Sequence, residues 1–422
     1  MSGRFTSLEI PLYRRLLIGG IFNFLAMQIA LIARAWLAYD LTGSNTALGG
    51  VLIGFGISSI VAIPSAGVLA DRFSKRSILL LTGTGQGLVS AALALAVATD
   101  SIEYWMLVMA SVVQGAMISF IAPARMGFMA DAVDRERLTN AVFLSQSSVQ
   151  LTRVFGPAAA GALIGVDAIG VAGVYVIAAL CSAAGIAYTV GLPAGRPTAT
   201  SNQTPLGDLV DGLRYVRSNR PVAHLITLSF IVVLVAFPHT AFLPVVADDV
   251  FDTGSFGFGM LTTAAAVGAL GTSLGLANID RSRLWRLQAL AAVAFGGFLL
   301  AFGMAPSFAV AVALIFCVGA ASAAFQAMNN SLVLTSVPVE YHGRMQSLLM
   351  LSFSGFGLAA LPLGIVADAL GLRETLVIMG AVVVAVSTWS LVRRGDGPDA
   401  TDIASGPVSS DAATDPAGEV RR

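Results

Sequence analysis

The sequence has few charged side chains for its length. Only 11% of its 422 residues are Asp, Glu, Lys or Arg, whereas about a quarter of a soluble domain is charged. Lysine occurs once, as Lys75, and the formal net charge is zero. So few charges cannot coat a soluble globule of this size, and a neutral chain gives no reason to expect a nucleic-acid partner.

The chain also lacks the residue patterns of common catalytic and metal sites. Lys75 stands between Ser74 and Arg76, so the Gly-Lys-Ser/Thr core of a phosphate-binding loop is absent, which argues against ATP hydrolysis. The two cysteines, Cys181 and Cys317, lie in apolar runs, where unpaired core thiols are expected. No HExxH motif, nucleophile elbow or metal-spaced Cys/His set occurs, so we expect no enzymatic activity, no cofactor and no metal.

Long apolar runs dominate the sequence instead. Hydrophobic residues make up 56% of the chain, and its mean hydropathy is +0.82. Many uncharged runs reach the length of about 18 residues that a membrane-spanning helix needs. Barrel strands alternate in polarity and are about half as long, so the runs favour helices and predict an all-α membrane protein. The first run, which begins near Arg15, lacks the small-residue cleavage site of a secretory signal, so we expect it to remain as a span.

The runs predict twelve transmembrane helices in two pseudo-symmetric six-helix bundles. We expect a cytoplasmic N-terminus at 1–14, a bundle at 15–192, a cytoplasmic linker at 193–221, a second bundle at 222–393 and a disordered cytoplasmic tail at 394–422. The predicted spans are 15–38, 47–70, 77–99, 103–124, 139–165, 169–192, 222–247, 256–278, 286–304, 308–331, 346–369 and 374–392. The linker stretch "LGDLVDGLRYVRSNR" has the pattern of an amphipathic helix that lies along the membrane surface.

Basic and acidic loops alternate along the chain. Loops after even-numbered spans carry the arginines and the lysine, among them Arg72, Lys75, Arg76, Arg135, Arg137, Arg281 and Arg344. The loops between them carry Asp100, Glu103, Asp167, Asp248, Asp249 and Asp252, with Arg373 as the exception. The positive-inside rule therefore predicts a multi-pass protein of the cytoplasmic (inner) cell membrane with both termini in the cytoplasm.

The two halves of the chain share a weak internal repeat. The stretch "VDRERLTNA" at 133–141 matches "VPVEYHGRM" at 337–345, and Pro157 and Pro362 then fall at nearly the same point of the fifth and eleventh predicted spans. "GVLADR" and "GLANIDR" both follow an even-numbered span. Two six-helix halves related in this way are typical of secondary transporters, which move small molecules by alternating access.

The loop "GVLADRFSKR" resembles the hallmark of the major facilitator superfamily. Gly67, Leu69, Ala70, Asp71, Arg72, Lys75 and Arg76 fit its pattern, and Ser74 stands where the family has its second glycine. Four further stretches resemble the siderophore (enterobactin-type) and macrolide efflux branch: "WLAYDLTGS", "APARMGFMADAVDRERL", "RVFGPAAAG" and "HGRMQSL". Together the resemblance covers residues 15 to 392.

The hallmark loop predicts a conformational latch. Asp71 lies at the C-terminal end of the second span, where the helix dipole disfavours an anion by a few tenths to about one kcal/mol. It therefore needs a partner, either the N-terminus of a neighbouring helix, which the resemblance suggests is the eleventh, or Arg125. Gly67, one turn earlier, would allow close approach, and Arg72 and Arg76 would complete the latch. The alternative is a solvated loop that obeys the positive-inside rule.

Polar side chains inside the spans are candidates for the substrate cavity, because intramembrane charge is rare and often functional. Spacings of four, three and four place Arg34 on one helical face with Asn23, and Arg153 on one face with Gln146 and Gln150. The resemblance implies that the first and fifth spans border a central cavity. There, two arginines would suit an anionic or polyphenolic substrate. The full candidate set is Asn23, Arg34, Gln114, Gln146, Gln150 and Arg153.

Each arginine also has a structural alternative. Arg34 lies in the outer third of its predicted span, so its side chain could snorkel to the membrane interface. Arg153 lies too deep to snorkel and could instead bridge helix ends or backbone carbonyls.

The fifth span also carries a packing motif. "GPAAAG" resembles the fifth-helix motif of proton-coupled drug antiporters, although Thr152 and Phe143 stand where that motif has glycines. We expect Gly156, Pro157 and Gly161 to serve helix packing, with Pro157 kinking the helix.

Proton coupling would require a titratable group that faces the cavity. Asp40, Asp368 and His239 are the candidates, with helix capping as the alternative for Asp40 and a satisfied core histidine as the alternative for His239.

Taken together, these features predict a monomeric secondary transporter that exports a small amphipathic or anionic molecule, siderophore- or drug-like, by proton antiport. One alternative is proton-coupled uptake of a small organic anion. Another is a non-transporting membrane sensor or assembly factor on the same scaffold, which should have lost the latch and the intramembrane charges that this chain retains.

Overall fold

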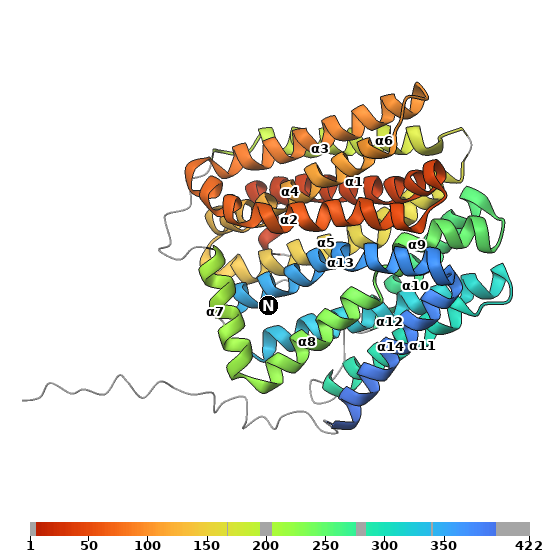
Figure 1. Cartoon of the computed structure of the whole chain (residues 1–422). Coiled ribbons are helices and arrows are strands. Elements are labelled where there is room, and N and C mark those ends of the chain that lie inside the picture. The colour runs from red at the N-terminus through yellow and green to blue at the C-terminus, as the bar shows by residue number, and fades with distance from the viewer. Residues whose placement is uncertain (1–5, 167, 195–204, 276–283, 339–340, 394–422) are drawn as a thin grey trace, which may run out of the picture.

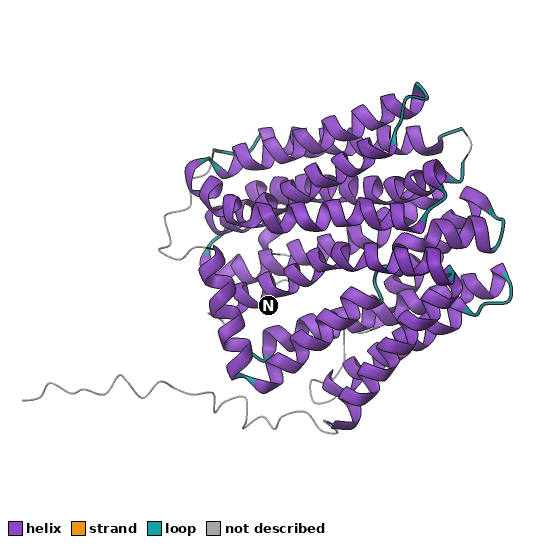
Figure 2. Cartoon of the chain, in the orientation of Figure 1, coloured by secondary structure: helices purple, strands orange, loops and turns teal. Residues whose placement is uncertain are grey.

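The computed structural model describes residues 6–166, 168–194, 205–275, 284–338 and 341–393. These residues form helices joined by short loops, without a strand in the described ranges (Figure 2). The predicted all-α fold is therefore confirmed. Some side chains on helical backbone lie outside the description, among them those of residues 63–72, of Gln150 and of several residues between 342 and 354.

The helices before the linker are η1 (Thr6–Glu9), α1 (Pro11–Thr42), α2 (Asn45–Arg72), α3 (Lys75–Ala98), α4 (Tyr104–Ala132), α5 (Arg135–Ile164) and α6 (Gly170–Val190). The linker forms α7 (Pro205–Ser218). After it come α8 (Arg220–Val235), α9 (His239–Val245), the π-helix η2 (Val246–Val250), α10 (Gly254–Gly275), α11 (Leu284–Gly303), α12 (Phe308–Thr335), α13 (His342–Leu370) and α14 (Leu372–Arg393). We call α1–α6 the N-terminal half and α8–α14 the C-terminal half.

Ten described segments are long and apolar enough to cross a membrane. They comprise α1, α3, α4, α6, α11, stretches of α2, α10, α12 and α14, and the segment Arg220–Val250. In α13 the apolar stretch Gly355–Leu370 is described, and α5, several of whose side chains lie outside the description, is not among these segments. The described helices support a multi-pass membrane protein, while the count of twelve spans stays a prediction.

The segment predicted as the seventh span is not one continuous α-helix. It breaks after Val235 and resumes as α9 at His239, because Pro238 has no N–H to continue the helical hydrogen bonds. Hydrogen bonds of the i to i+3 type, such as His239 N to Ala236 O at 3.1 Å, carry the chain through the turn. The expectation of a single regular helix at 222–247 was therefore wrong in this detail.

The amphipathic helix predicted in the linker is present as α7. It lies across the ends of the long helices in Figure 1. Its Gly212 packs on Arg344 of α13, and Asp211 lies 3.7 Å from the Arg344 guanidinium. Tyr215 stacks on Tyr341 with ring centroids 4.2 Å apart. The helix is thus attached to the C-terminal half.

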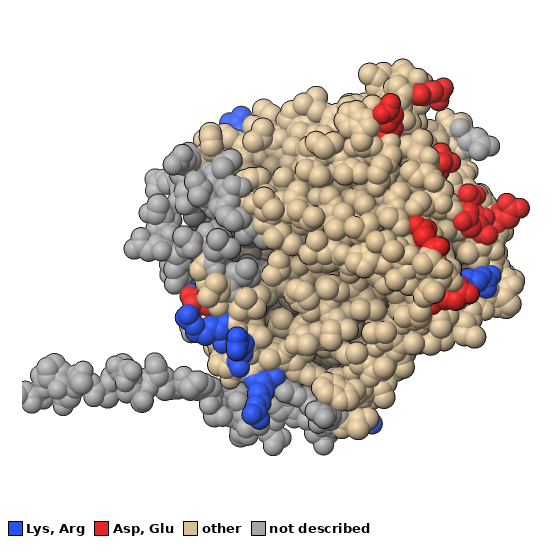
Figure 3. All heavy atoms as spheres, in the orientation of Figure 1, with Lys and Arg blue, Asp and Glu red and all other residues tan. Residues whose placement is uncertain are grey.

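Charged side chains gather at the two ends of the helices and leave the middle of the molecule uncharged on the face shown in Figure 3. We call one end the basic end, after Arg14, Arg15, Lys75, Arg76 and Arg214, and the other the acidic end, after Asp40, Asp100, Glu103, Asp248, Asp249 and Asp252. This pattern suits helices that cross a membrane with both ends in water.

Candidate functional site

The two halves meet mainly along two antiparallel helix pairs, α2 with α13 and α5 with α10. Close approach in the first pair depends on glycine, because a Cβ atom on Gly49 would lie 2.7 Å from the Ala360 carbonyl oxygen. A Cβ atom on Gly364 would likewise meet the backbone of Asn45. These contacts lie where α2 begins and α13 ends, so they join the halves on the acidic side.

Glycine also allows close approach in the second pair, α5 with α10. A Cβ atom on Gly161 of α5 would lie 3.1 Å from the Cα of Gly259 and would overlap the Thr262 hydroxyl. One turn later, a Cβ atom on Gly165 would lie 3.2 Å from the Cα of Phe256. Because α5 ends and α10 begins here, this seam too lies on the acidic side.

Asp368 binds the halves together at the acidic end. Its carboxylate, on the last turns of α13, accepts hydrogen bonds from Asn45 N at 3.0 Å, Asn45 Nδ2 at 2.9 Å, Thr46 N at 2.9 Å, Thr46 Oγ1 at 2.6 Å and Ser44 Oγ at 3.0 Å. The first N–H groups of a helix have no partner within it, so this carboxylate caps the start of α2 from the opposite half. Asp368 is one of the predicted proton-coupling candidates. In this structure its carboxylate forms hydrogen bonds that connect the C-terminal half to the N-terminal half.

The buried apolar cores differ between the two ends. On the acidic side a single cluster runs through both halves, and it includes Leu48 of α2, Phe258 of α10 and Phe325 of α12. At the basic end the described core is divided. One cluster, with Phe128 and Met129, belongs to the N-terminal half, and another, with Met345, belongs to α7 and the C-terminal half. Among the described side chains, the apolar cluster that joins the two halves therefore lies on the acidic side.

In the predicted latch loop, the structure describes only the second part. Gly67, Asp71 and Arg72 belong to the side chains outside the description, so the latch stays a prediction. Arg76 is half-buried, with its backbone N–H 3.3 Å from the Ala194 carbonyl oxygen.

Ser74 accepts a hydrogen bond from Ser77 N at 3.2 Å and so caps the N-terminus of α3. This capping gives a physical reason for a serine where the family pattern has glycine.

Lys75, the one lysine, is buried rather than solvated. Its Nζ atom lies 2.7 Å from Asp131 Oδ2 and 3.0 Å from the Gly127 carbonyl oxygen, both on α4. Gly127 makes room for it, since a Cβ atom there would lie 2.9 Å from Lys75 Cε. The ion pair fastens the start of α3 to the end of α4 within the N-terminal half.

Arg125 also points into the N-terminal half. Its guanidinium carbon lies 5.1 Å from the centroid of the Phe24 ring, and a Cβ atom on Gly20 would come within 2.9 Å of it. The side chain is buried, and its Nη2 atom has no hydrogen-bond partner. Arg125 lines a cavity of about 40 Å³ together with Asn23 and Gln86.

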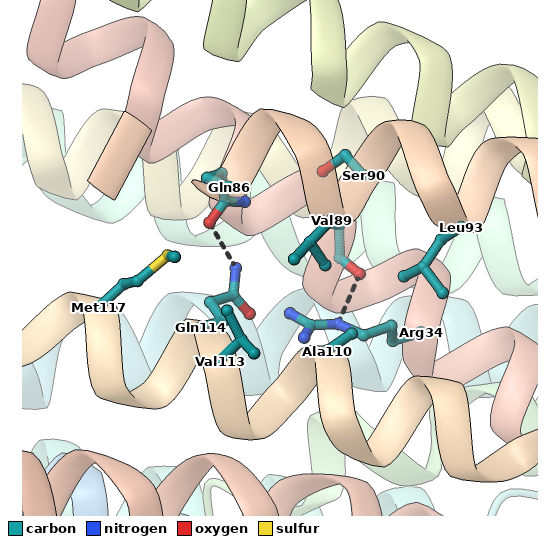
Figure 4. Close-up of a pocket in the computed structure, with 10 residues that line it drawn as sticks. Arg34, Gln86, Val89, Ser90, Leu93, Ala110, Val113, Gln114 and Met117 are labelled. Carbon is teal, nitrogen blue, oxygen red and sulfur yellow. Dashed lines mark hydrogen bonds between the residues drawn. The ribbon is translucent and has the colours of Figure 1, made fainter. Parts of the chain in front are cut away.

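A second, smaller cavity of about 10 Å³ surrounds Arg34 between α1, α3 and α4 (Figure 4). Gln86 lines both cavities. It accepts a hydrogen bond from Gln114 Nε2 at 3.3 Å. Asn23 donates to the Gly19 carbonyl at 3.1 Å, while its Oδ1 atom is buried without a partner. The face of α1 predicted from spacing thus turns toward the interior of the N-terminal half.

The candidates on α5 lie closer to the contact between halves. Gln146 and Arg153 are half-buried, and Arg153 takes part in an interaction within the protein. Gly156 faces α1, because a Cβ atom there would overlap the side chain of Gln28. Pro157 lies inside the helix, four residues before the Gly161 contact with α10.

The two remaining proton-coupling candidates have contrasting surroundings. Asp40 is exposed on the last turns of α1. His239 is buried, and its Nδ1 atom lies 2.7 Å from the Ala236 carbonyl oxygen. A carbonyl oxygen can only accept, so Nδ1 carries the proton. The imidazole therefore adds a second hydrogen bond to the Ala236 carbonyl, which also accepts from the His239 backbone N–H at 3.1 Å.

Several participants were not among the sequence candidates. Gln86 could have been found, since it is a polar residue inside a predicted span, the criterion that selected Gln114, whereas Asp131 lies outside the predicted spans. The sequence gives no such signal for Thr46, Asn45 and Ser111. Serine, threonine and asparagine are common at helix starts and inside spans, and their hydrogen-bond partners depend on which helix lies next to them.

The whole chain resembles known membrane transport proteins. A family model described as "Transmembrane secretion effector" matches residues 2–410. The chain is 24% identical to the staphyloferrin A transporter of Staphylococcus aureus over 329 residues, which are 76% of this chain and 81% of that protein. It is also 24% identical to the enterobactin exporter EntS of Shigella boydii over 343 residues, 80% of each chain.

Solved structures agree at the level of the fold. The nucleoside transporter NupG superposes with a TM-score of 0.66 at 15% identity, over 90% of this chain and 98% of that chain. A bacterial homologue of the human lysosomal transporter Spinster, in an inward-facing and occupied conformation, gives a TM-score of 0.68 at 16% identity, over 93% and 97% of the two chains.

Proposed function

Because the chain belongs to the transmembrane secretion effector family of the major facilitator superfamily, and is therefore a membrane transporter, we propose that it exports a small siderophore-like molecule by alternating access. The exported compound is amphipathic or anionic, and protons that move inward drive its exit. The basic end faces the cytoplasm, as the positive-inside rule requires.

One observation carries the proposal: the halves are joined at the acidic end by a polar contact that can break. Asp368 binds the start of α2 there, and the glycine contacts bring the helices of the two halves together. Such a pair of rigid halves with a breakable contact at one end is what alternating access needs. With the acidic end outside, this form would receive its cargo from the cytoplasm.

The predicted latch would act in the opposite form. When the acidic end opens, the basic ends of α2 and α13 would approach, and Asp71 with Gly67 would meet the start of α13. Each conformation would then be held by a carboxylate from one of these two helices at the first turn of the other. To drive the change, a ligand or a proton gradient needs only to supply the difference in free energy between these two contacts.

Support for the substrate class comes from the relatives and from the polar side chains. The relatives named for staphyloferrin A and enterobactin point to siderophores, which are polar chelators with ionisable groups. Arg153 on α5 is a donor of the kind that such groups bind, since a guanidinium offers forked hydrogen bonds and stacks on rings. Gln146, on the same face, would add a neutral donor and acceptor.

Metabolite profiling tests the function directly. Cells and medium of the source organism are compared between a deletion strain and an overexpressing strain under iron limitation. We expect a chelator to accumulate inside the deletion strain and in the medium of the overexpressing strain. A compound that the deletion strain leaves in the medium would instead support uptake of an organic anion.

Proton coupling is tested in proteoliposomes with an imposed pH gradient, with enterobactin and staphyloferrin A as the first compounds. Transport should follow the gradient and stop when an ionophore collapses it. Transport that is unchanged without the gradient would contradict the antiport mechanism. A compound found by profiling replaces these two if neither is carried.

A further inference from the structure

Arg34 is a buried cation whose hydrogen bonds are incomplete. Only 2% of the residue is exposed. Its Nε atom donates to the Ala30 carbonyl at 3.2 Å and its Nη1 atom donates to Ser111 Oγ at 3.2 Å, while Nη2 has no partner. Removing a charge from water costs several kcal/mol unless a counter-charge and hydrogen bonds compensate for it.

The described part of the chain supplies no such counter-charge. Its ion pairs involve Asp131, Glu9 and Asp211, all at the basic end, and no carboxylate lies within ion-pair distance of Arg34 among the described residues. Both bonded partners of the guanidinium are neutral oxygens. The positive charge is therefore unbalanced in a medium where electrostatic interactions are strong.

The guanidinium borders the small cavity of about 10 Å³ between α1, α3 and α4 (Figure 4). Ser90, Gln114 and Gln86 line it with polar groups, while Val89, Leu93, Ala110, Val113 and Met117 supply its apolar wall. A cavity of this size has room for about one water-sized species, so it suits a single small ion or molecule rather than an organic compound. Met117 is flexible enough to adjust the space.

Two further buried groups lack partners here. The Oε1 atom of Gln114 is one, and in Figure 4 the Gln114 amide lies beside the Arg34 guanidinium. An amide can exchange its oxygen and nitrogen by turning over, and the Gln114 and Gln86 amides could turn together and keep the bond between them. The hydroxyl of Tyr175 on α6, which is buried in the same half, is the other.

We propose that Arg34 holds a small monovalent anion of the halide type, such as chloride, inside the N-terminal half. The anion would accept from Arg34 Nη2 and from the hydroxyl of Ser90, and from Gln114 once its amide has turned. It would neutralise the guanidinium and tie together α1, α3 and α4. A water molecule could accept the same hydrogen bond but would leave the charge uncompensated, which is why the geometry favours an anion.

Chloride binding to the purified full-length protein in detergent tests this site. Radioactive chloride should be retained with saturation, and bromide should compete with it while gluconate should not. The unfolding temperature should be higher in sodium chloride than in sodium gluconate of equal ionic strength, because a ligand that binds only the folded state stabilises it. Wild-type protein without saturable binding would overturn the proposal and assign the cavity to water.

Variants locate the binding. Arg34→Gln should lower chloride affinity by at least about tenfold, the loss expected when a buried charge partner is removed. Arg34→Lys keeps the positive charge but lacks the forked donors of the guanidinium, so it should retain part of the chloride affinity. Arg214→Gln removes an exposed arginine of α7 and should bind chloride as the wild type does. If Arg34→Gln folds and binds chloride normally, the site lies elsewhere and the proposal fails.

This test does not depend on transport. The site lies inside one half, and its binding assay needs no substrate, so loss of the anion site would leave the proposed export function standing. Equally, a failure to detect export would not affect chloride binding.

Discussion

Thr46 Oγ1 donates a 2.6 Å hydrogen bond to the carboxylate of Asp368, and the two residues belong to opposite halves of the chain. The backbone N–H groups of Asn45 and Thr46 donate to the same carboxylate. These groups open α2 and have no acceptor within it, and the helix dipole favours an anion at this position. One side chain of the C-terminal half thus completes the first turn of a helix in the N-terminal half.

Asp368→Asn should shift the protein toward a form that is open at the acidic end. The amide keeps one acceptor but loses the charge. Hydrogen bonds to charged groups contribute about 1.5–3 kcal/mol when buried, and we expect about 1–2 kcal/mol for this exposed set. That changes a conformational ratio by about five- to thirtyfold. Electron–electron resonance distances between spin labels at Ser101 and Ser307 should lengthen.

The two labelled serines are exposed at the acidic end, one in each half, and Cys181 and Cys317 are replaced by serine so that only the labels react. Asp100→Asn is the matched control, because Asp100 lies at the same end, in the turn between α3 and α4 of one half. Equal distance distributions for Asp368→Asn and the control would show that the carboxylate does not hold the halves together.

Gly161→Ala should open the same end through sterics alone. An added Cβ atom would overlap Thr262 and press on the Gly259 backbone of α10. In an exposed helix the same change would stabilise the protein by about 1 kcal/mol through helix propensity. We therefore expect longer distances between the same two spin labels. We also expect a lower unfolding temperature, although alanine favours a helix more than glycine does.

Gly271→Ala serves as the comparison for this change. It also lies in α10, and a Cβ atom there would meet nothing within 4 Å. It should leave the spin-label distances unchanged and raise the unfolding temperature slightly. If Gly161→Ala behaves in the same way, α5 and α10 do not require glycine at their contact.

The sequence predicted the helices well because the membrane leaves few alternatives. Backbone groups in lipid must be satisfied within the segment, so an apolar run of sufficient length becomes a helix. The break at Pro238 also follows from local chemistry. It was not predicted because Pro238 lies inside a strongly apolar run that was read as one continuous span. Ser74 was recognised only as a departure from a family pattern, while the structure shows that it caps α3.

Side-chain partners were harder to predict, because they depend on how helices cross. Asp368 was recognised as an acid near a helix end, but its bonds to Asn45 and Thr46 follow from the antiparallel contact of α2 with α13. The face of α1 that carries Arg34 was found from spacing, whereas the helices that it faces, α3 and α4, are a property of the tertiary fold.

Asp131→Asn should loosen the start of α3. It removes the charge partner of Lys75, whose side chain is 6% exposed while that of Asp131 is 42% exposed. A fully buried pair would lose about 3–5 kcal/mol in this way, and we expect about 1–2 kcal/mol for this half-exposed one. Because Lys75 is the one lysine in the chain, amine-reactive labelling followed by peptide mass spectrometry reports directly on its exposure.

Labelling of Lys75 should be slow in the wild type and several-fold faster in Asp131→Asn. Asp134→Asn, at an exposed position on the same end of α4 and α5, should leave the rate unchanged. Fast labelling in the wild type would mean that the ion pair does not bury the amine.

His239→Asn should fold normally and keep its response to a pH gradient. The side-chain nitrogen of asparagine lies close to where Nδ1 of the histidine lies, so it can donate to the Ala236 carbonyl as the ring does. His239→Leu loses this side-chain hydrogen bond and should lose about 0.5–1.5 kcal/mol of stability, because the Ala236 carbonyl keeps the backbone N–H of residue 239 as a donor. Unfolding temperature separates the two variants, and gradient-driven transport in proteoliposomes shows whether the histidine also carries protons. A stable His239→Asn protein that no longer responds to the gradient would assign the proton to this ring and contradict a purely structural role.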